Sequence, residues 1–374
     1  MKKKNDIKKE NSVVIKEERD LTYDWLRLIA TIFVVIGHSV YLSHTTTFGG
    51  VSYSLPNNIS GFYFSSIMEL WKWLSEWVYS FHMPLFFMLS GAVLALKPVD
   101  KLEKIIKSKT KRLIFPYFIY GWLFMLPVKF LADFYNHDSF LLAMKGFLKG
   151  VDSGHLWFLP ALFWLIILFV ILEKILKKLK VDNPYILLII TAGIQLYYNY
   201  IPVEILGLMN GTKYIFWFAF GYCFEYERKK NKPWNIKKTT LAFIVVLIIE
   251  FLNKKYNILT PFFLIICGSF FTYLMADLCN RIFKNFGKTK IWNVLIRNLF
   301  FVYLLHDPLE YVALKIFMNS SIMSNGLGCL LYFSSRTIII FVICVALGEL
   351  IRILKKGIIY ILNDSNNATE INNA

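Results

Sequence analysis

The chain has 374 residues, of which 56% are hydrophobic and 17% aromatic, with a mean hydropathy of +0.50 and a net charge of +17. A soluble protein of this length carries more charge and fewer aromatic residues, so the composition excludes an ordinary soluble enzyme. A strong positive charge can indicate nucleic-acid binding, but here the basic residues alternate with apolar segments, which is typical of a membrane protein.

Ten apolar segments along the chain predict membrane-spanning helices, since a bilayer core about 30 Å thick needs roughly 20 apolar residues. In chain order they are 25–42, 77–96, 113–131, 156–172, 185–200, 214–226, 241–252, 261–278, 299–317 and 329–351. The sixth and seventh are short, so their ends could extend, or they could break and re-enter the membrane where protein shields them. We therefore expect an all-α integral membrane protein.

Basic residues predict the orientation of these segments. With the N-terminus in the cytoplasm, 33 of the 42 Lys and Arg residues fall in the leader, the cytoplasmic loops and the tail. This asymmetry follows the positive-inside rule and predicts that both ends face the cytoplasm. Some of the basic residues could also bind an anionic ligand or lipid headgroups.

The chain divides into three predicted parts. Residues 1–20 form a basic leader that we expect to be disordered, residues 21–356 form the membrane domain, and residues 357–374 form a polar cytoplasmic tail, disordered from residue 363. The leader contains no signal-peptide cleavage site, and the five cysteines have the spacing of packing residues. The richness of the whole chain in Lys, Asn and Ile is typical of an AT-rich bacterium. We therefore expect a multi-pass protein of a bacterial cell membrane.

Ionisable side chains within spans are candidates for function because they are costly in lipid. Arg27 and His38 are separated by 11 residues in the first span, which places them on one helix face about 16 Å apart. Arg27 lies at the cytoplasmic edge, where Asp24 can pair with it, and His38 lies near mid-membrane. A structural interpretation is equally open, in which Arg27 reaches lipid headgroups and His38 bonds to a neighbouring helix.

The second span and the entry to the third supply further candidates. His82 lies near the outer end of the second span and Ser90 lies deeper, in a helix that Pro84 kinks. Lys109 and Arg112 are one turn apart at the cytoplasmic surface, where they could hold a phosphorylated ligand. From the sequence alone, ordinary cytoplasmic topology charge is the favoured explanation of the same two residues.

The later spans carry the remaining ionisable candidates. His155 and Trp157 open the fourth span at the outer interface, where Trp is common. In the ninth span, Asp307 and Glu310 follow His306 and could orient an imidazole or balance its charge. Within the tenth span, Arg336 needs a carboxylate or carbonyl partner and is expected to form a structural ion pair.

These residues lie in motifs that resemble the membrane acyltransferase-3 family. The motifs are D-x-x-R-x10-H in the first span, F-H-M-P-L-F-F-x-L-S-G in the second, K-x-x-R-L-x-x-P-Y at the third, H-L-W-F-L at the fourth and Y-L-x-H in the ninth. The resemblance extends from about residue 21 to residue 356 and includes the ten-span layout. It departs from the family at the third-span entry, where Lys109 and Lys111 stand in a segment that is often Arg-rich.

The resemblance implies an O-acyltransferase that moves an acyl group, most often acetyl, from cytoplasmic acyl-CoA to a hydroxyl of an extracytoplasmic polysaccharide or glycan. It implies that His38 is the general base, with His306 as a second catalytic candidate. Arg27, Lys109 and Arg112 would bind the phosphates of the donor. The implied partners are membrane lipid, a carbohydrate acceptor and glycan-synthesis machinery, and neither nucleic acid nor a metal is expected.

Two other functions stay open from the sequence. In a transporter or lipid-linked glycan flippase, Arg27, His38, His306 and Arg336 would line a path, although the chain shows no repeated pair of broken helices. A metal transporter would use the histidines, but these come from separate spans without Cys partners or an H-x-x-x-H motif. Neither a catalytic nucleophile nor the identity of the acceptor follows from the sequence.

Overall fold

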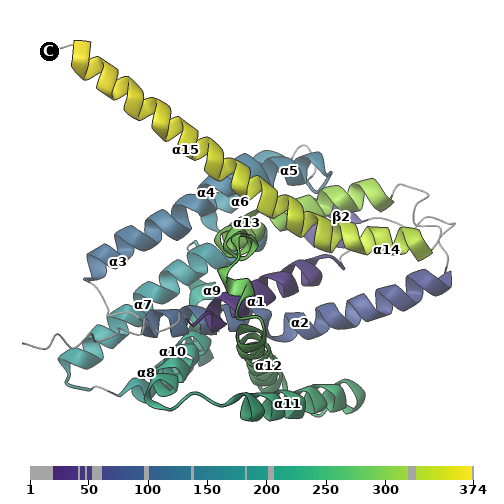
Figure 1. The fold of residues 1–374 in the computed structure, drawn as a ribbon, viewed down its shortest axis with the longest axis vertical. Helices are drawn as coiled ribbons and strands as arrows, with labels where there is room; N and C mark the ends of the chain where they lie inside the picture. The colour runs from purple at the N-terminus through teal and green to yellow at the C-terminus, as the bar shows by residue number, and fades with distance from the viewer. Residues whose placement is uncertain are drawn as a thin grey trace, which may run out of the picture.

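The computed structural model describes residues 20–40, 43–46, 49–52, 61–96, 101–135, 139–181, 183–200, 206–318 and 326–372. Within these residues the chain is a bundle of helices with one short antiparallel hairpin (Figure 1). The predicted leader lies outside the described residues, apart from Asp20. The helical character agrees with the predicted all-α class, and the strands β1 (Ser43–Thr46) and β2 (Gly49–Ser52) pair within the connection between the first two helices.

The helices follow the predicted apolar segments in order. The first half of the chain forms α1 (Thr22–His38), α2 (Gly61–Ala95), α3 (Leu102–Lys109), α4 (Phe115–Tyr120), α5 (Leu126–Leu131), α6 (Phe140–Lys149) and α7 (Phe158–Lys178). The second half forms α8 (Pro184–Leu196), α9 (Leu208–Lys213), α10 (Ile215–Lys230), α11 (Ile236–Tyr256), α12 (Pro261–Ile282), α13 (Lys290–Met318), α14 (Gly326–Ser334) and α15 (Ile340–Asn372).

Local sequence explains several helix boundaries. Proline is the first residue of both α8 and α12, where its missing N–H costs no hydrogen bond. Asn183 and Asn235 precede α8 and α11, and each side chain accepts a hydrogen bond from a backbone N–H of the first turn. At its far end, α15 continues to Asn372, so the expected disordered tail is helical instead, in a segment that no proline interrupts.

Two wide turns interrupt the third predicted span without breaking it. The π-helical segments Thr110–Ile114 and Gly121–Met125 join α3, α4 and α5 into one continuous rod. Pro116 and Pro127 stand near the starts of α4 and α5, and a proline removes an N–H from the helical ladder, which the wider turns accommodate. A third π segment, Ser335–Ile339, joins α14 to α15.

Within the residues that the structure describes, five stretches are long and apolar enough to cross a membrane. They are Ser66–Ala95, Leu102–Leu131, Phe140–Lys178, Pro261–Ile282 and Leu327–Lys355. The other predicted spans lie on α1, α8, α10, α11 and α13, which are helical but shorter or more polar. The count of ten and the orientation of the chain therefore stay predictions, whereas the multi-pass character is clear.

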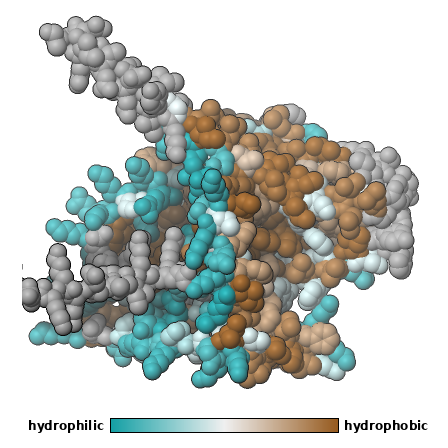
Figure 2. All heavy atoms as spheres, viewed as in Figure 1, coloured by the Kyte–Doolittle hydropathy of each residue, from teal (hydrophilic) through white to brown (hydrophobic). Residues whose placement is uncertain are grey.

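The surface has the polarity of a protein embedded in lipid. Figure 2 shows apolar side chains gathered over one broad part of the molecule and hydrophilic side chains gathered at the side where α3 and the end of α7 lie. Many large apolar residues of the molecule are exposed, including Leu123, Ile189 and Leu131. Such contiguous exposed apolar area is unfavourable in water and favourable against acyl chains.

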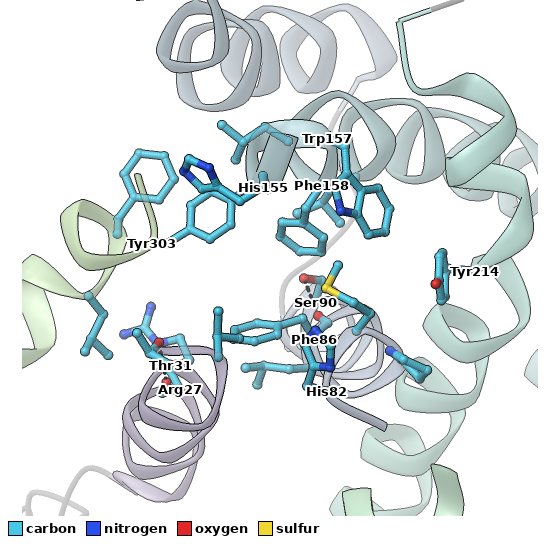
Figure 3. A pocket seen from close by; sticks show the side chains of 18 of the residues that line it. Arg27, Thr31, His82, Phe86, Ser90, His155, Trp157, Phe158, Tyr214 and Tyr303 are labelled. Atoms are coloured by element: carbon cyan, nitrogen blue, oxygen red, sulfur yellow. Dashed lines mark hydrogen bonds between the residues drawn. The ribbon is translucent and has the colours of Figure 1, made fainter. Parts of the chain in front are cut away.

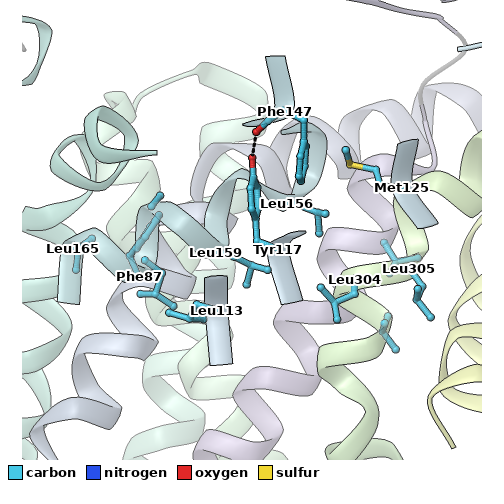
Figure 4. Close-up of a cluster of buried hydrophobic side chains, with 14 of the residues drawn as sticks. Phe87, Leu113, Tyr117, Met125, Phe147, Leu156, Leu159, Leu165, Leu304 and Leu305 are labelled. Atoms are coloured by element: carbon cyan, nitrogen blue, oxygen red, sulfur yellow. Dashed lines mark hydrogen bonds between the residues drawn. The ribbon is translucent and has the colours of Figure 1, made fainter. Parts of the chain in front are cut away.

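Two contacts illustrate how closely the helices pack, one between α2 and α10 and one between α4 and α6. Gly91 of α2 and Gly221 of α10 each meet the backbone of the other helix. An added Cβ at Gly91 would lie 2.0 Å from the carbonyl oxygen of Phe218. Small residues at such contacts let two backbones approach closely. Elsewhere in the core, the Tyr117 ring stacks on Phe147 at 4.3 Å and its hydroxyl donates to the Phe147 carbonyl (Figure 4).

Candidate functional site

A cavity of about 1410 Å³ lies between α1, α2, α7, α10, α12 and α13. Its lining includes both Arg27 and His38, so the two residues that the sequence placed on one helix face do open onto one space. Figure 3 shows Arg27 and Thr31 on one wall, His155 and Trp157 across from them, and His82 and Ser90 on a third side. Most of the predicted site residues therefore line one cavity.

One end of the cavity carries positive charge. Arg27 donates to the Asp24 carboxylate at 2.7 Å, and its side chain stays 46% exposed. Lys109, Asn293 and Arg297 also line the cavity. Asn293 and Arg297 lie in the first turns of α13, which follows α12 in the chain. The end of α12 lies beside the start of α1, since Asn280 donates to the Thr22 hydroxyl at 3.1 Å, so we place these residues at the same end of the cavity as Arg27. A group of cations and amides at a helix-lined mouth is suited to phosphates.

Hydrogen bonds from α2 fix the position of His38. His38 is the last residue of α1, and the two residues beside it are each held by α2. Ser75 donates to the Gly37 carbonyl at 2.9 Å, and the Trp71 indole donates to the Ser39 hydroxyl at 2.8 Å. Gly37 also contacts the Tyr79 ring so closely that a Cβ would lie 2.8 Å from it. These contacts fix the backbone on both sides of His38 and thereby the position from which its imidazole extends.

Asp307 is the centre of the site. Its Oδ1 lies 3.1 Å from Nδ1 of His38, and its Oδ2 lies 3.1 Å from Nδ1 of His155 and 2.8 Å from Nζ of Lys129. The sequence predicts that Asp307 could orient the imidazole of its neighbour His306 or balance its charge. Adjacent helical residues point about 100° apart, so the carboxylate instead meets histidines from α1 and from the turn before α7.

Lys129 is a member of this cluster that the sequence analysis missed. Its side chain is only 3% exposed, and its ammonium lies 4.6 Å from the centre of the Phe134 ring as well as 2.8 Å from Asp307. A buried lysine is tolerated when a carboxylate compensates its charge. The signal was present, because Lys129 stands alone among apolar residues in L-P-V-K-F-L within a predicted span.

The contacts of His38 determine which of its nitrogens can act as a base. A carboxylate can only accept hydrogen bonds, so Nδ1 of a neutral His38 carries the proton and Nε2 keeps its lone pair. Lys129 balances the charge of Asp307, so the cluster is close to neutral when the imidazoles are neutral. The His38 side chain is 19% exposed and lines the cavity. This is the arrangement of an oriented general base.

His306 and His155 complete the polar cluster. His306 is fully buried, and its Nδ1 donates to the carbonyls of Val302 and Tyr303 at 2.9 and 3.0 Å. Its ring lies edge-on between His38 at 5.1 Å and His155 at 5.3 Å. Nε2 of His306 is buried with no hydrogen-bond partner among the described residues. It is therefore an acceptor available to a bound hydroxyl.

The remaining predicted residues fall into two groups. His82, Ser90, His155 and Trp157 line the cavity; Nδ1 of His82 lies 3.1 Å from the Val78 carbonyl, and Ser90 donates to the Phe86 carbonyl at 2.8 Å. Glu310 and Arg336 lie outside that lining and pair at 3.7 Å. The Arg336 guanidinium also donates to the His38 carbonyl at 3.3 Å, which ties the end of α1 to α14 and α15.

Arg112, predicted to bind the donor, also lies outside the cavity lining. It is exposed on the first π segment and does not belong to the lining, whereas Lys109, one turn earlier, does. Its role toward phosphate stays a prediction. Within the described residues, no group of three or more His, Cys, Asp or Glu side chains has the arrangement of a metal site.

Comparison with known proteins gives one match. A family model described as an acyltransferase domain, acyltransferase-3, matches residues 20–349. Searches of curated proteins and of solved structures found no match. The matched residues include α1 with Arg27 and His38, and α13 with Asp307.

Proposed function

Because the chain belongs to the acyltransferase-3 family, it is a membrane acyltransferase. From that premise we propose that it transfers an acyl group from cytoplasmic acyl-CoA to a hydroxyl of an extracytoplasmic carbohydrate. The acyl group proposed is acetyl, and the setting is a bacterial cell membrane. The observation that carries the proposal is the pairing of His38 with Asp307 on the wall of a cavity whose other end is cationic.

The shape and charge of the cavity support acyl-CoA as the donor. Arg27 and Lys109 at one end would hold its phosphates, and Arg297 and Asn293 line the same part of the wall. The pantetheine arm is long and mostly apolar. It would extend past Val34 and Leu89 toward His38, bringing the thioester to the base. Arg112, outside the lining, would act only on the part of the cofactor that projects beyond the cavity.

Acyl transfer then follows from the oriented imidazole. Nε2 of His38 takes the proton of the acceptor hydroxyl as that oxygen forms a bond to the thioester carbonyl carbon. The carbon–sulfur bond breaks, and the imidazolium returns the proton to the departing thiolate, so the products are an O-ester and free CoA. Asp307 stabilises the imidazolium during the step, while Lys129 keeps the carboxylate in place. Nε2 of His306 can accept a hydrogen bond from a second hydroxyl of the carbohydrate acceptor.

Substitution of His38 tests the proposal. His38→Ala and His38→Gln should each lower ester formation by about 10²–10⁴-fold, because glutamine can hydrogen-bond but cannot accept a proton near neutral pH. The measurement is ester-linked acetate on isolated glycan from a deletion strain that carries each variant, at matched protein abundance. Near-normal acetate with His38→Gln would remove His38 from the mechanism and transfer its role to His306.

A further inference from the structure

The end of the cavity opposite Arg27 contains polar and aromatic side chains that the transfer step does not use. They come from three elements that meet there: Gln195 and Tyr198 at the end of α8, Lys213 and Tyr214 before α10, and Phe262 at the start of α12. The far end of α10 contacts the start of α1, since Arg228 donates to Asp20 at 3.1 Å. The start of α10, with Lys213, therefore lies away from the cationic mouth.

Lys213 brings a positive charge to this end. Its side chain is exposed, and its ammonium lies 5.6 Å from the centre of the Tyr214 ring and 5.9 Å from that of Tyr198. Among the described residues, no carboxylate lies within ion-pair distance of it. The two aromatic rings attract the ammonium without neutralising it, so its charge can pair with an anion.

Gln195 offers a complementary hydrogen-bond acceptor. Its Oε1 is buried, and no described residue donates a hydrogen bond to it. A buried carbonyl oxygen without a donor is unfavourable, so a bound group that supplies an O–H or N–H is favoured there. A sugar hydroxyl supplies one, whereas an unprotonated phosphodiester of a lipid headgroup does not.

Aromatic rings form the wall beside these polar groups. The Tyr214 ring lies 5.7 Å from Trp157 and stacks on Phe87 at 4.8 Å, and Trp217 lies 5.3 Å from Phe262. Figure 3 shows Trp157 and Tyr214 on two sides of the open space. Flat aromatic faces suit the C–H faces of a pyranose ring. Trp157 follows His155 by two residues, so this wall adjoins the cluster around Asp307.

Resting on the acyl transfer proposed above, we propose that this end of the cavity is the acceptor subsite and that it selects a sugar bearing an anionic substituent. The aromatic wall packs on the sugar ring, the Gln195 oxygen accepts from a ring hydroxyl, and Lys213 pairs with a carboxylate or phosphate on the sugar. A hydroxyl of the neighbouring part of the saccharide then faces His38. The acceptor is thereby an acidic glycan.

Saccharide binding to purified full-length protein in detergent, without acyl-CoA, tests the subsite. The probes are a trisaccharide of galacturonic acid, its fully methyl-esterified form, and a mannotriose with and without one 6-phosphate. The acidic form of at least one pair should bind about tenfold more tightly than its neutral partner, as a charge-assisted contact predicts. The pair that shows the difference identifies whether the anion is a carboxylate or a phosphate.

Two lysine variants make the test specific. Lys213→Gln should remove the preference for the acidic probe and leave the affinity for the neutral one unchanged. Lys149→Gln, at an exposed lysine that does not line the cavity, should keep the preference. Equal affinities for acidic and neutral probes, binding of none of them, or a preference that survives Lys213→Gln would overturn the proposal.

The same binding measurement on His38→Gln protein separates the subsite from the chemistry. If the His38→Gln protein keeps the preference for acidic probes but transfers no acyl group, the subsite is supported. The lost activity is then due to the missing base alone. Normal transfer to a glycan with no acidic preference would leave the acyltransferase function intact and reject the subsite.

Discussion

Replacing Lys129 by Met tests whether the buried ion pair with Asp307 holds the site together. The two groups are 2.8 Å apart and their side chains are 3% and 6% exposed, so removing the cation leaves a carboxylate with little access to water. With an effective dielectric constant of about 20, the direct attraction at this distance is ~6 kcal/mol. The contacts from His38 and His155 compensate part of the loss, so the expected destabilisation is about 3–5 kcal/mol.

The double variant Lys129→Met with Asp307→Asn separates stability from activity. With both charges removed, most of the lost stability should return, because no uncompensated charge is buried. Activity should stay low, since an asparagine can present its amide N–H to His38 and favour the wrong tautomer. In a related Asp–His pair of serine proteases the same change lowers turnover by about 10⁴-fold.

The assay is reversible denaturation in mixed micelles combined with transfer from labelled acetyl-CoA, for the wild type, both single variants and the double variant. Met is chosen because its unbranched apolar side chain matches lysine as far as Cε and lacks the ammonium. A loss below about 1 kcal/mol for Lys129→Met would show that the ammonium and the carboxylate do not form a buried charge pair. Full activity in the double variant would show that Asp307 does not orient the base.

Three further predictions concern other parts of the molecule. Arg27→Ala should weaken CoA binding about tenfold at unchanged thermal stability, and Arg112→Ala should weaken it less because Arg112 lies outside the cavity lining; equal effects in a CoA titration would argue against the cavity as the donor site. Gly91→Ala should prevent normal packing of α2 on α10, whereas Gly193→Ala, where a Cβ meets nothing within 4 Å, should leave the midpoint of thermal denaturation unchanged; a tolerated Gly91→Ala would contradict the close approach. Reporters fused after Lys180 or Lys232 should read as cytoplasmic and one after Asn210 as external, and a reversal at any of them would mean that the ten-span topology is wrong before that point.

The sequence predicts the elements of this fold better than it predicts their contacts. Apolar segment length and the positions of proline and asparagine anticipate where helices lie, because these signals are local. The shared face of Arg27 and His38 also follows from helical periodicity and agrees with their common cavity. The wide turns in the third span, in contrast, depend on how two prolines are accommodated by neighbouring helices.

Contacts between distant helices could not be predicted from local pattern. Asp307 was placed beside His306 because the two are adjacent in sequence, but its partners come from α1, α5 and the turn before α7. His38 was expected near mid-membrane and His155 at the outer interface, yet both contact the same carboxylate. Lys129 carried the ordinary signal of an intramembrane charge and could have been found by asking which acidic residue compensates it.

Sharing one carboxylate between the first and the ninth predicted spans has a consequence for biosynthesis. Asp307 follows His38 by about 270 residues, and at roughly 5–20 residues per second a ribosome needs about 15–55 s to make the connecting chain. During that interval Lys129 has been synthesised without its counter-ion, and its long side chain must reach toward the headgroups instead. We expect that insertion of α13 then draws the ammonium inward and brings Asp307 to His38 in the same event. A chain truncated before Asp307 thus keeps an uncompensated intramembrane cation, the kind of feature by which membrane quality control can distinguish unfinished proteins from complete ones.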